Sequence, residues 1–157
     1  MPSFSNRRRL RFSPQQMFDL VADVERYPEF VPLCESLVVT ERRQEGERQV
    51  LIARMGIGYK AIRETFATRV TLDTAGDRIL VEYVDGPFRR LENRWRFLPA
   101  PGGSEIDFYI DYEFRSAMLA LVMGAVFDKA FRKFAAAFEA RAEAIYGRSP
   151  PVSTAPG

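Results

Sequence analysis

Residues 104–146 read SEIDFYIDYEFRSAMLALVMGAVFDKAFRKFAAAFEARAEAIY, and the spacing of their apolar residues changes once. From Ile106 to Phe114, apolar and polar residues alternate, which is typical of a strand with one buried and one wet face. After Ser116 the apolar residues recur at helical spacing, along a stripe of Phe127, Phe131, Phe134, Phe138, Ala142 and Ile145. The stretch therefore predicts a last strand followed directly by one helix over residues 116–146, roughly 45 Å long.

Clusters of turn-forming residues divide the preceding part of the chain into runs of about 8 to 12 residues. The clusters lie at residues 44–47, 56–58, 74–77, 85–87 and 99–103. The run before the last strand again alternates, with Leu91, Asn93, Trp95 and Phe97 on one face. We expect an antiparallel meander of about six strands from residue 36 to residue 114.

The beginning of the chain predicts one further strand and two short helices. Residues 5–12 mix arginines with apolar residues and are expected to form the first strand. Ser13, Pro14 and Gln16 then have the spacing of a capping box with proline in the first helical turn. Two later prolines interrupt this helix, so a second short helical turn is expected near residues 25–30.

Three consecutive arginines, Arg7, Arg8 and Arg9, lie in the first predicted strand. Because neighbouring residues of a strand point to opposite faces, these arginines do not form one dense patch. The favoured interpretation is an edge strand protected by charge. A contact with anionic lipid or ribosomal RNA is the alternative.

The order of elements predicts an α+β fold, and this order resembles the helix-grip fold. A curved antiparallel sheet of about seven strands wraps around a long C-terminal helix, with two short helices after the first strand. One domain is expected over residues 1–147, and residues 148–157, which contain three prolines, are expected to be a disordered tail. A single helix crossing a curved sheet leaves a space that apolar side chains or a ligand must fill.

Composition excludes several classes of function. The 157 residues are 46% hydrophobic, contain no His and one Cys, and carry a net charge of +2. Without His the commonest general base and metal ligand are missing, and a single Cys allows no disulfide within the chain. The mild charge argues against a DNA partner. The N-terminus lacks the apolar segment of a secretory signal, so a cytoplasmic location is expected.

Three segments carry a resemblance to a known family. They are residues 12–34 (FSPQQMFDLVADVERYPEFVPLC), residues 85–97 (DGPFRRLENRWRF) and residues 141–147 (RAEAIYG). Together they resemble the coenzyme Q-binding proteins of the START-like, or helix-grip, superfamily, over roughly residues 3–147. The same family is also labelled polyketide cyclase or dehydrase, and it includes bacterial proteins described as ribosome association toxins.

The resemblance implies a chaperone or carrier of ubiquinone that supports respiratory electron transfer and needs no other cofactor. Two alternatives stay open: a protein that binds a ribosomal subunit, and a cyclase-like enzyme. Ubiquinone requires a long apolar tunnel for its tail and a few polar groups for its carbonyls. The candidate ligand-binding residues are Phe66, Tyr83, Asn93, Trp95, Phe108, Tyr112, Met123, Phe127 and Phe131.

The first part of the predicted long helix is apolar nearly all round, from Met118 to Phe127. It is too short to span a bilayer, which requires about 20 apolar residues. We expect Met118, Leu119, Leu121 and Val122 to form a gate that touches the inner face of the membrane. Burial against the N-terminal helices, or in a dimer, is the equally weighted alternative.

Few residues suit catalysis, so an enzyme is not expected and no metal site is predicted. Glu64 falls on the inward register of its strand between Ile62 and Phe66, where it either faces a ligand or pairs with an arginine. Cys34 has no His to activate it and is interpreted as a small buried apolar residue. A cyclase-like reaction would require Glu64, Tyr83 or Tyr112 as its acid.

Overall fold

Seven antiparallel strands form one sheet in the computed structural model, which describes residues 3–147. The strands are β1 Ser3–Leu10, β2 Cys34–Glu45, β3 Arg48–Tyr59, β4 Ile62–Asp73, β5 Arg78–Asp85, β6 Phe88–Ala100 and β7 Gly103–Phe114. The helices are α1 Pro14–Ala22, the 3₁₀ helix η1 Val24–Glu29, and α2 Ala117–Tyr146. Residues 148–157, the predicted tail, lie outside the described part of the chain.

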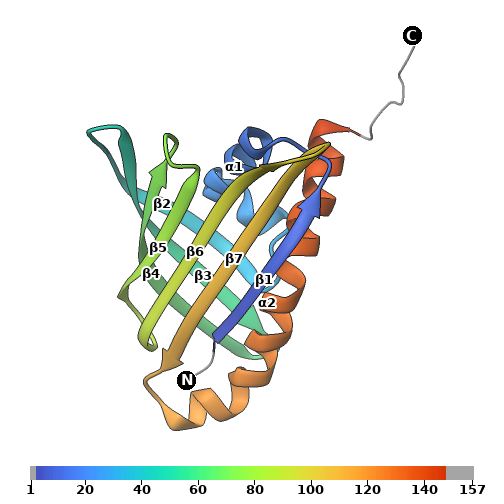
Figure 1. The fold of residues 1–157 in the computed structure, drawn as a ribbon. Coiled ribbons are helices and arrows are strands. Elements are labelled where there is room, and N and C mark those ends of the chain that lie inside the picture. Colours follow the sequence, from blue (N-terminus) through green and yellow to red (C-terminus); the bar gives the residue numbers. More distant parts are fainter. Residues whose placement is uncertain (1–2, 148–157) are drawn as a thin grey trace.

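The sheet has the order β1-β7-β6-β5-β4-β3-β2, so β2 to β7 form an unbroken meander and β1 joins it beside β7. Figure 1 shows the sheet curling around the molecule, with α2 running along it from the end of β7 back towards α1. The predicted helix-grip architecture is confirmed. The core lies inside this curl, between the concave face of the sheet and α2.

In the last two strands, the alternation of apolar and polar residues corresponds to an alternation of buried and partly exposed side chains. In β7 the side chains of Ile106, Phe108 and Ile110 are buried, and the residues between them are partly exposed. In β6, Leu91 and Trp95 face the core in the same way. The two strands pair so that Trp95 lies opposite Phe108, with their ring centroids 4.8 Å apart.

Both main helices begin at a serine cap, α1 at the predicted Ser13 and α2 at Ser116. The Ser13 hydroxyl accepts a hydrogen bond from the backbone N–H of Gln16 at 3.0 Å, and the Gln16 side chain accepts one from the backbone N–H of Ser13 at 2.9 Å. At α2 the Ser116 hydroxyl accepts from the N–H of Leu119 at 3.1 Å. These caps satisfy N–H groups that a helix start leaves without partners.

Two expectations require correction. The first strand spans Ser3–Leu10 rather than residues 5–12, because the chain leaves the sheet at Leu10 to enter α1. The turn predicted at residues 56–58 is wrong: both glycines lie within β3, and the chain turns after Tyr59, where Lys60 has a positive φ of 54°. Gly56 lies so close to Ser36 of β2 that a Cβ atom there would overlap the Ser36 hydroxyl.

The arginines of β1 lie at the edge of the sheet, as predicted, and each has an acidic partner. Arg7 pairs with Asp107 at 2.7 Å, and Arg9 lies 3.8 Å from Glu105. Arg8 reaches α2, where its guanidinium lies 2.8 Å from Glu139. The three positive charges are thus balanced locally rather than gathered into one basic surface.

Candidate ligand-binding cavity

An apolar cavity lies between the concave face of the sheet, η1 and α2. About 100 Å³ of it is open to the centres of water-sized molecules, and one water needs roughly 10–15 Å³ by this measure. The cavity is therefore larger than a packing defect. Its walls are almost entirely hydrocarbon, so it is suited to an apolar occupant.

Each wall comes from a different element. The sheet contributes Phe66 of β4 and Trp95 of β6, whereas α2 contributes Phe127, Phe131 and Phe138. The end wall is the segment that contains η1 and the residues after it. Aromatic rings join the walls: the Phe138 ring lies 5.1 Å from Trp95 and 5.5 Å from Tyr27 of η1.

The predicted ligand-binding residues divide into two groups. Phe66, Asn93, Trp95, Phe127 and Phe131 line the cavity. The remaining four lie around it and do not line it: Tyr83, Phe108, Tyr112 and Met123. Direct contact with a ligand stays a prediction for all nine residues.

Three of these four residues support the walls from behind: Phe108, Tyr112 and Met123. The Phe108 ring lies 5.9 Å from Phe134, and Met123 is almost fully buried on α2. Tyr112 is buried between β7 and α2, 5.3 Å from Phe131 and beyond the cavity. Burial raises the pKa of Tyr112, and nearby Asp128 adds to the shift. Tyr112 is therefore kept neutral as part of the core.

Among residues 3–147, Asn93 has the one side-chain amide in the cavity wall, and two hydrogen bonds fix its orientation. Its Nδ2 donates to the backbone carbonyl of Tyr109 at 2.9 Å, and its Oδ1 accepts from the Trp95 indole N–H at 2.8 Å. Asn93 therefore holds the indole of Trp95 against the cavity. One N–H of the amide is left for a further partner.

Sequence reasoning missed part of the lining. Thr68 is buried and lines the cavity, between Phe66 and Val70 on the inward face of β4. The period-2 pattern of β4 was sufficient to place it there. Val31 and Leu33, in the segment after η1, also line the cavity. The prolines of this segment predicted a break in the helix but not a contact with the cavity.

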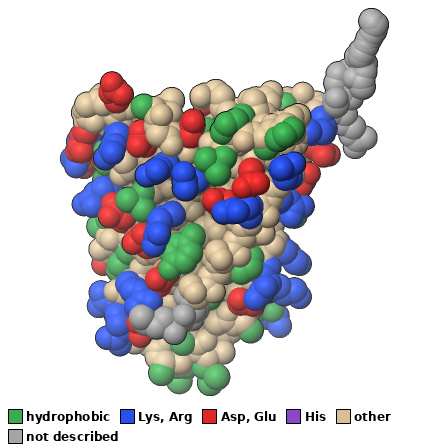
Figure 2. Space-filling view, in the orientation of Figure 1, with side chains coloured by type: hydrophobic (Ala, Val, Ile, Leu, Met, Phe, Trp, Pro, Cys, Tyr) green, Lys and Arg blue, Asp and Glu red, His purple; other side chains and the backbone are tan. Residues whose placement is uncertain are grey.

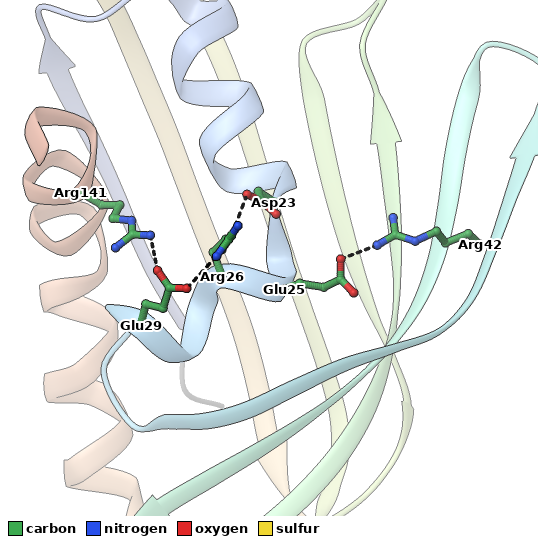
Figure 3. Close-up of polar contacts among 6 residues, drawn as sticks. All are labelled: Asp23, Glu25, Arg26, Glu29, Arg42 and Arg141. Atoms are coloured by element: carbon green, nitrogen blue, oxygen red, sulfur yellow. Dashed lines mark hydrogen bonds and ion pairs between the residues drawn. The ribbon is translucent and has the colours of Figure 1, made fainter. Parts of the chain in front are cut away.

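Ion pairs fasten η1 over the end of the cavity (Figure 3). Glu29 binds Arg141 of α2 and lies 3.1 Å from Arg26, and Glu25 lies 2.7 Å from Arg42 of β2. Hydrogen bonds from Arg141 and Arg26 lower the pKa of Glu29, which keeps its carboxylate charged. The end wall is thus tied to α2 on one side and to the sheet on the other.

The candidates for acid–base or nucleophilic chemistry that the sequence indicated do not line the cavity: Glu64, Tyr83, Tyr112 and Cys34. Within residues 3–147 its lining includes no Asp or Glu, and no cluster of His, Cys, Asp and Glu could hold a metal ion. Glu64 is partly exposed on β4 and forms no ion pair with the described residues. Cys34 is buried, and this burial raises the pKa of its thiol to about 11, so the thiolate is scarce near neutral pH.

The predicted gate residues lie on a part of α2 that extends past the ends of the strands (Figure 1). The exposed fraction is 74% for Met118, 84% for Leu121 and 48% for Val122, whereas Leu119 is partly buried against the core. Figure 2 shows hydrophobic side chains gathered at this end of the molecule. Burial of Met118, Leu121 and Val122 against the N-terminal helices is therefore wrong, whereas their burial in a dimer stays a prediction.

Residues 10–139 match the model of a protein family described as "Polyketide cyclase / dehydrase and lipid transport". The chain belongs to this family. The matched residues include the whole meander and most of α2, so every wall of the cavity lies within the family domain. No helix in residues 3–147 combines the length and the apolar character that crossing a bilayer would require.

Two kinds of family member resemble the chain over most of its length. Ribosome association toxin RatA of Escherichia coli is 34% identical over 147 residues, which cover 93% of this chain and 90% of the relative. Coenzyme Q-binding protein COQ10 homolog B of Xenopus laevis is 31% identical over 150 residues, which cover 92% of this chain and 59% of the relative. The two names point to different functions on one domain.

Solved structures agree with the architecture. An 18 kDa protein of Caulobacter crescentus is 37% identical, with a TM-score of 0.78 and coverage of 94% of this chain and 100% of its own. A START superfamily protein of Mycobacterium smegmatis has a TM-score of 0.75 at 20% identity, and the Zhui aromatase/cyclase has 0.78 at 17%. At these lower identities the likeness concerns the fold alone.

The segments that carried the family resemblance meet in the structure. Glu29 and Phe30 belong to the first segment, and Arg141 to the third: Arg141 binds the Glu29 carboxylate and lies 5.0 Å from the centre of the Phe30 ring. The second segment forms the turn into β6 and supplies Asn93 and Trp95 to the cavity. The motifs thus mark the cavity wall and the fastening of its end.

Proposed function

We propose that this chain binds a ubiquinone-type lipid in the cavity and carries it between sites of use, in support of respiratory electron transfer. The observation that carries the proposal is the apolar cavity between sheet and α2, lined by Phe66, Trp95, Phe127 and Phe131 and, within the described residues, by no carboxylate. The lipid transport function in the family's description and the relative named for coenzyme Q binding support this choice.

The dimensions of the cavity favour binding of the ligand's ring rather than its whole tail. A space of about 100 Å³ for water centres suits a ring-sized group, whereas a drug-sized ligand usually occupies roughly 300–1,000 Å³. The long isoprenoid tail therefore lies between α2 and the sheet, after these two elements have moved apart. This role requires binding and release without chemical change, so the protein is not an enzyme in this proposal.

The test is organic extraction of the purified protein, followed by mass spectrometry. We expect ubiquinone at about one molecule per chain. Trp95 gives a second measurement, because it is the only tryptophan of the chain and lines the cavity. Added short-tailed ubiquinone should quench its fluorescence to saturation at one equivalent. Protein that is isolated empty and whose fluorescence does not respond to quinone would contradict the proposal.

Association with a ribosomal subunit is the second candidate, and the RatA relatives favour it. The arginines of β1 do not support it, because each lies beside an acidic side chain. Protein that takes up no quinone but co-sediments with ribosomal subunits would replace the carrier proposal by this one.

Membrane contact through the first turns of α2 belongs to the carrier proposal, with the protein working in the cytoplasm at the inner face of the membrane. We expect Leu121→Asp to weaken binding to phosphatidylglycerol-containing vesicles by at least about tenfold, because burying a leucine stabilises by about 1.5–3 kcal/mol. Leu121 is 84% exposed, so the fold should be unaffected. Co-flotation with the vesicles measures the change.

Ile145→Asp is the matched control, since Ile145 is 52% exposed at the opposite end of the same helix. It introduces the same charge into α2 but should leave vesicle binding unchanged. An equal loss of vesicle binding in the two variants would mean that the added negative charge alone weakens binding. It would contradict a membrane contact at the beginning of α2.

A further inference from the structure

The hydroxyl of Tyr83 is buried and has no hydrogen-bond partner among residues 3–147. Tyr83 follows Ile79 and Val81 on the inward face of β5, and both of these line the cavity. A buried hydroxyl without a partner costs free energy that a phenylalanine at the same position would not cost. The phenol group therefore requires an explanation other than packing.

Tyr83 adjoins the cavity through its neighbours. Its ring lies 5.9 Å from Phe88, and the Phe88 ring lies 5.2 Å from Phe66, which lines the cavity. In the strand register Tyr83 is directly opposite Thr68, which also lines the cavity. The side chains of directly opposed residues start about 4.5–5.5 Å apart at Cβ.

A break in the strand pairing produces this opposition. Ala67 of β4 pairs with Asp85 and the next residue, Thr68, pairs with Tyr83, so Val84 is left between them without a partner. A bulge of this kind redirects side chains and often lies beside a functional site. Here it places a phenol and an alcohol together on the concave face.

Asn93 completes the polar set on the next strand. It pairs with Val81, two residues before Tyr83, so it lies diagonally across from the phenol. The three side chains come from β4, β5 and β6 and make up a polar patch: Thr68 and Asn93 lie in the otherwise apolar cavity wall, and Tyr83 adjoins them in the strand register. Each offers an O–H or N–H donor: the phenol, the alcohol and the amide hydrogen that Asn93 does not use within the protein.

We infer that Thr68, Tyr83 and Asn93 form the site for the polar head of the ligand, and that Tyr83 donates a hydrogen bond to a carbonyl or ether oxygen of an otherwise apolar molecule. The inference rests on the proposed carrier function and narrows its ligand class. Lipids whose ring carries acceptor oxygens fit this patch, and pure hydrocarbons leave the Tyr83 hydroxyl without a partner.

The test is Tyr83→Phe, with Trp95 fluorescence as the readout and two probes: a short-tailed ubiquinone, and an isoprenoid hydrocarbon without oxygen that competes for the cavity. We expect the variant to bind the quinone about five- to tenfold more weakly, the loss of one hydrogen bond. Its affinity for the hydrocarbon should be unchanged. The melting temperature of the ligand-free variant should stay the same or rise by a few degrees.

Tyr109→Phe is the matched control, because the Tyr109 hydroxyl donates to Asp111 at 3.0 Å on the outer face of the sheet. This variant should bind both probes like the wild type. Two results would overturn the inference and leave the carrier proposal standing. One is an unchanged quinone affinity in Tyr83→Phe. The other is an equal loss of affinity for both probes together with a lower melting temperature. Wild-type protein that binds no quinone would remove both.

Discussion

Replacement of Phe138 by alanine is expected to lower the free energy of unfolding by about 3–5 kcal/mol, the usual loss for a large aromatic side chain in a core. Phe138 is 2% exposed and joins three elements of the fold. Its ring lies 5.0 Å from Phe30, 5.5 Å from Tyr27 and 5.1 Å from Trp95. Truncation removes the contacts that connect α2 with η1 and with the sheet.

Denaturant unfolding followed by circular dichroism measures this loss, with the slope m unchanged if only stability is altered. Phe4→Ala is the control, because Phe4 is partly exposed on the edge strand, where its ring lies 6.2 Å from that of Phe108 and 5.1 Å from the guanidinium of Arg132. It should lose much less stability than Phe138→Ala. Similar losses in the two variants would mean that Phe138 is not the central contact between α2, η1 and the sheet.

Filling the cavity is expected to have the largest effect on ligand binding. Ala130→Phe should weaken quinone binding by about a hundredfold, because the new ring occupies space that the ligand's ring requires, and excluding about 100 Å² of apolar contact costs roughly 2.5 kcal/mol. Ala130 is buried on α2 and lines the cavity. Overpacking should cost no more than about 1–3 kcal/mol of stability, so the protein should still fold.

Ala136→Phe makes the same change on the exposed side of the same helix. Its quinone affinity, measured by quenching of Trp95 fluorescence, should equal that of the wild type. Retained quinone binding in Ala130→Phe would show that the ligand binds elsewhere, and would direct attention to the surface rather than to the cavity.

Most of the fold could be predicted because local patterns agree with the tertiary structure. The alternation from Ile106 to Phe114 and the helical stripe from Phe127 to Ala142 each correspond to a burial pattern that the structure confirms. Ile145, the last residue of the predicted stripe, is 52% exposed, because the end of α2 extends beyond the core. The turn expected at residues 56–58 failed for a physical reason. A glycine suits either a turn or a close approach of two strands, and only the pairing of Gly56 with Ser36 distinguishes the two.

The site could be predicted only in outline. Strand period assigns a residue to a face, but it does not say how far along the sheet the cavity extends. Phe108 and Trp95 are therefore equivalent by pattern, and only Trp95 reaches the empty space. The orphan hydroxyl of Tyr83 and the bulge that brings it opposite Thr68 depend on pairing between strands, which one sequence does not display.

The pairing of β1 with β7 has a consequence for how the protein is made. Arg7 and its partner Asp107 are 100 residues apart in the chain, so β1 leaves the site of synthesis long before the strand that completes its hydrogen bonds. At about 5–20 residues per second this interval is roughly 5–20 s. During it the arginines of β1 have no acidic neighbours from β7, and their repulsion discourages pairing with other chains. The rate of translation, rather than the rate of collapse, therefore sets the earliest time at which the sheet can close.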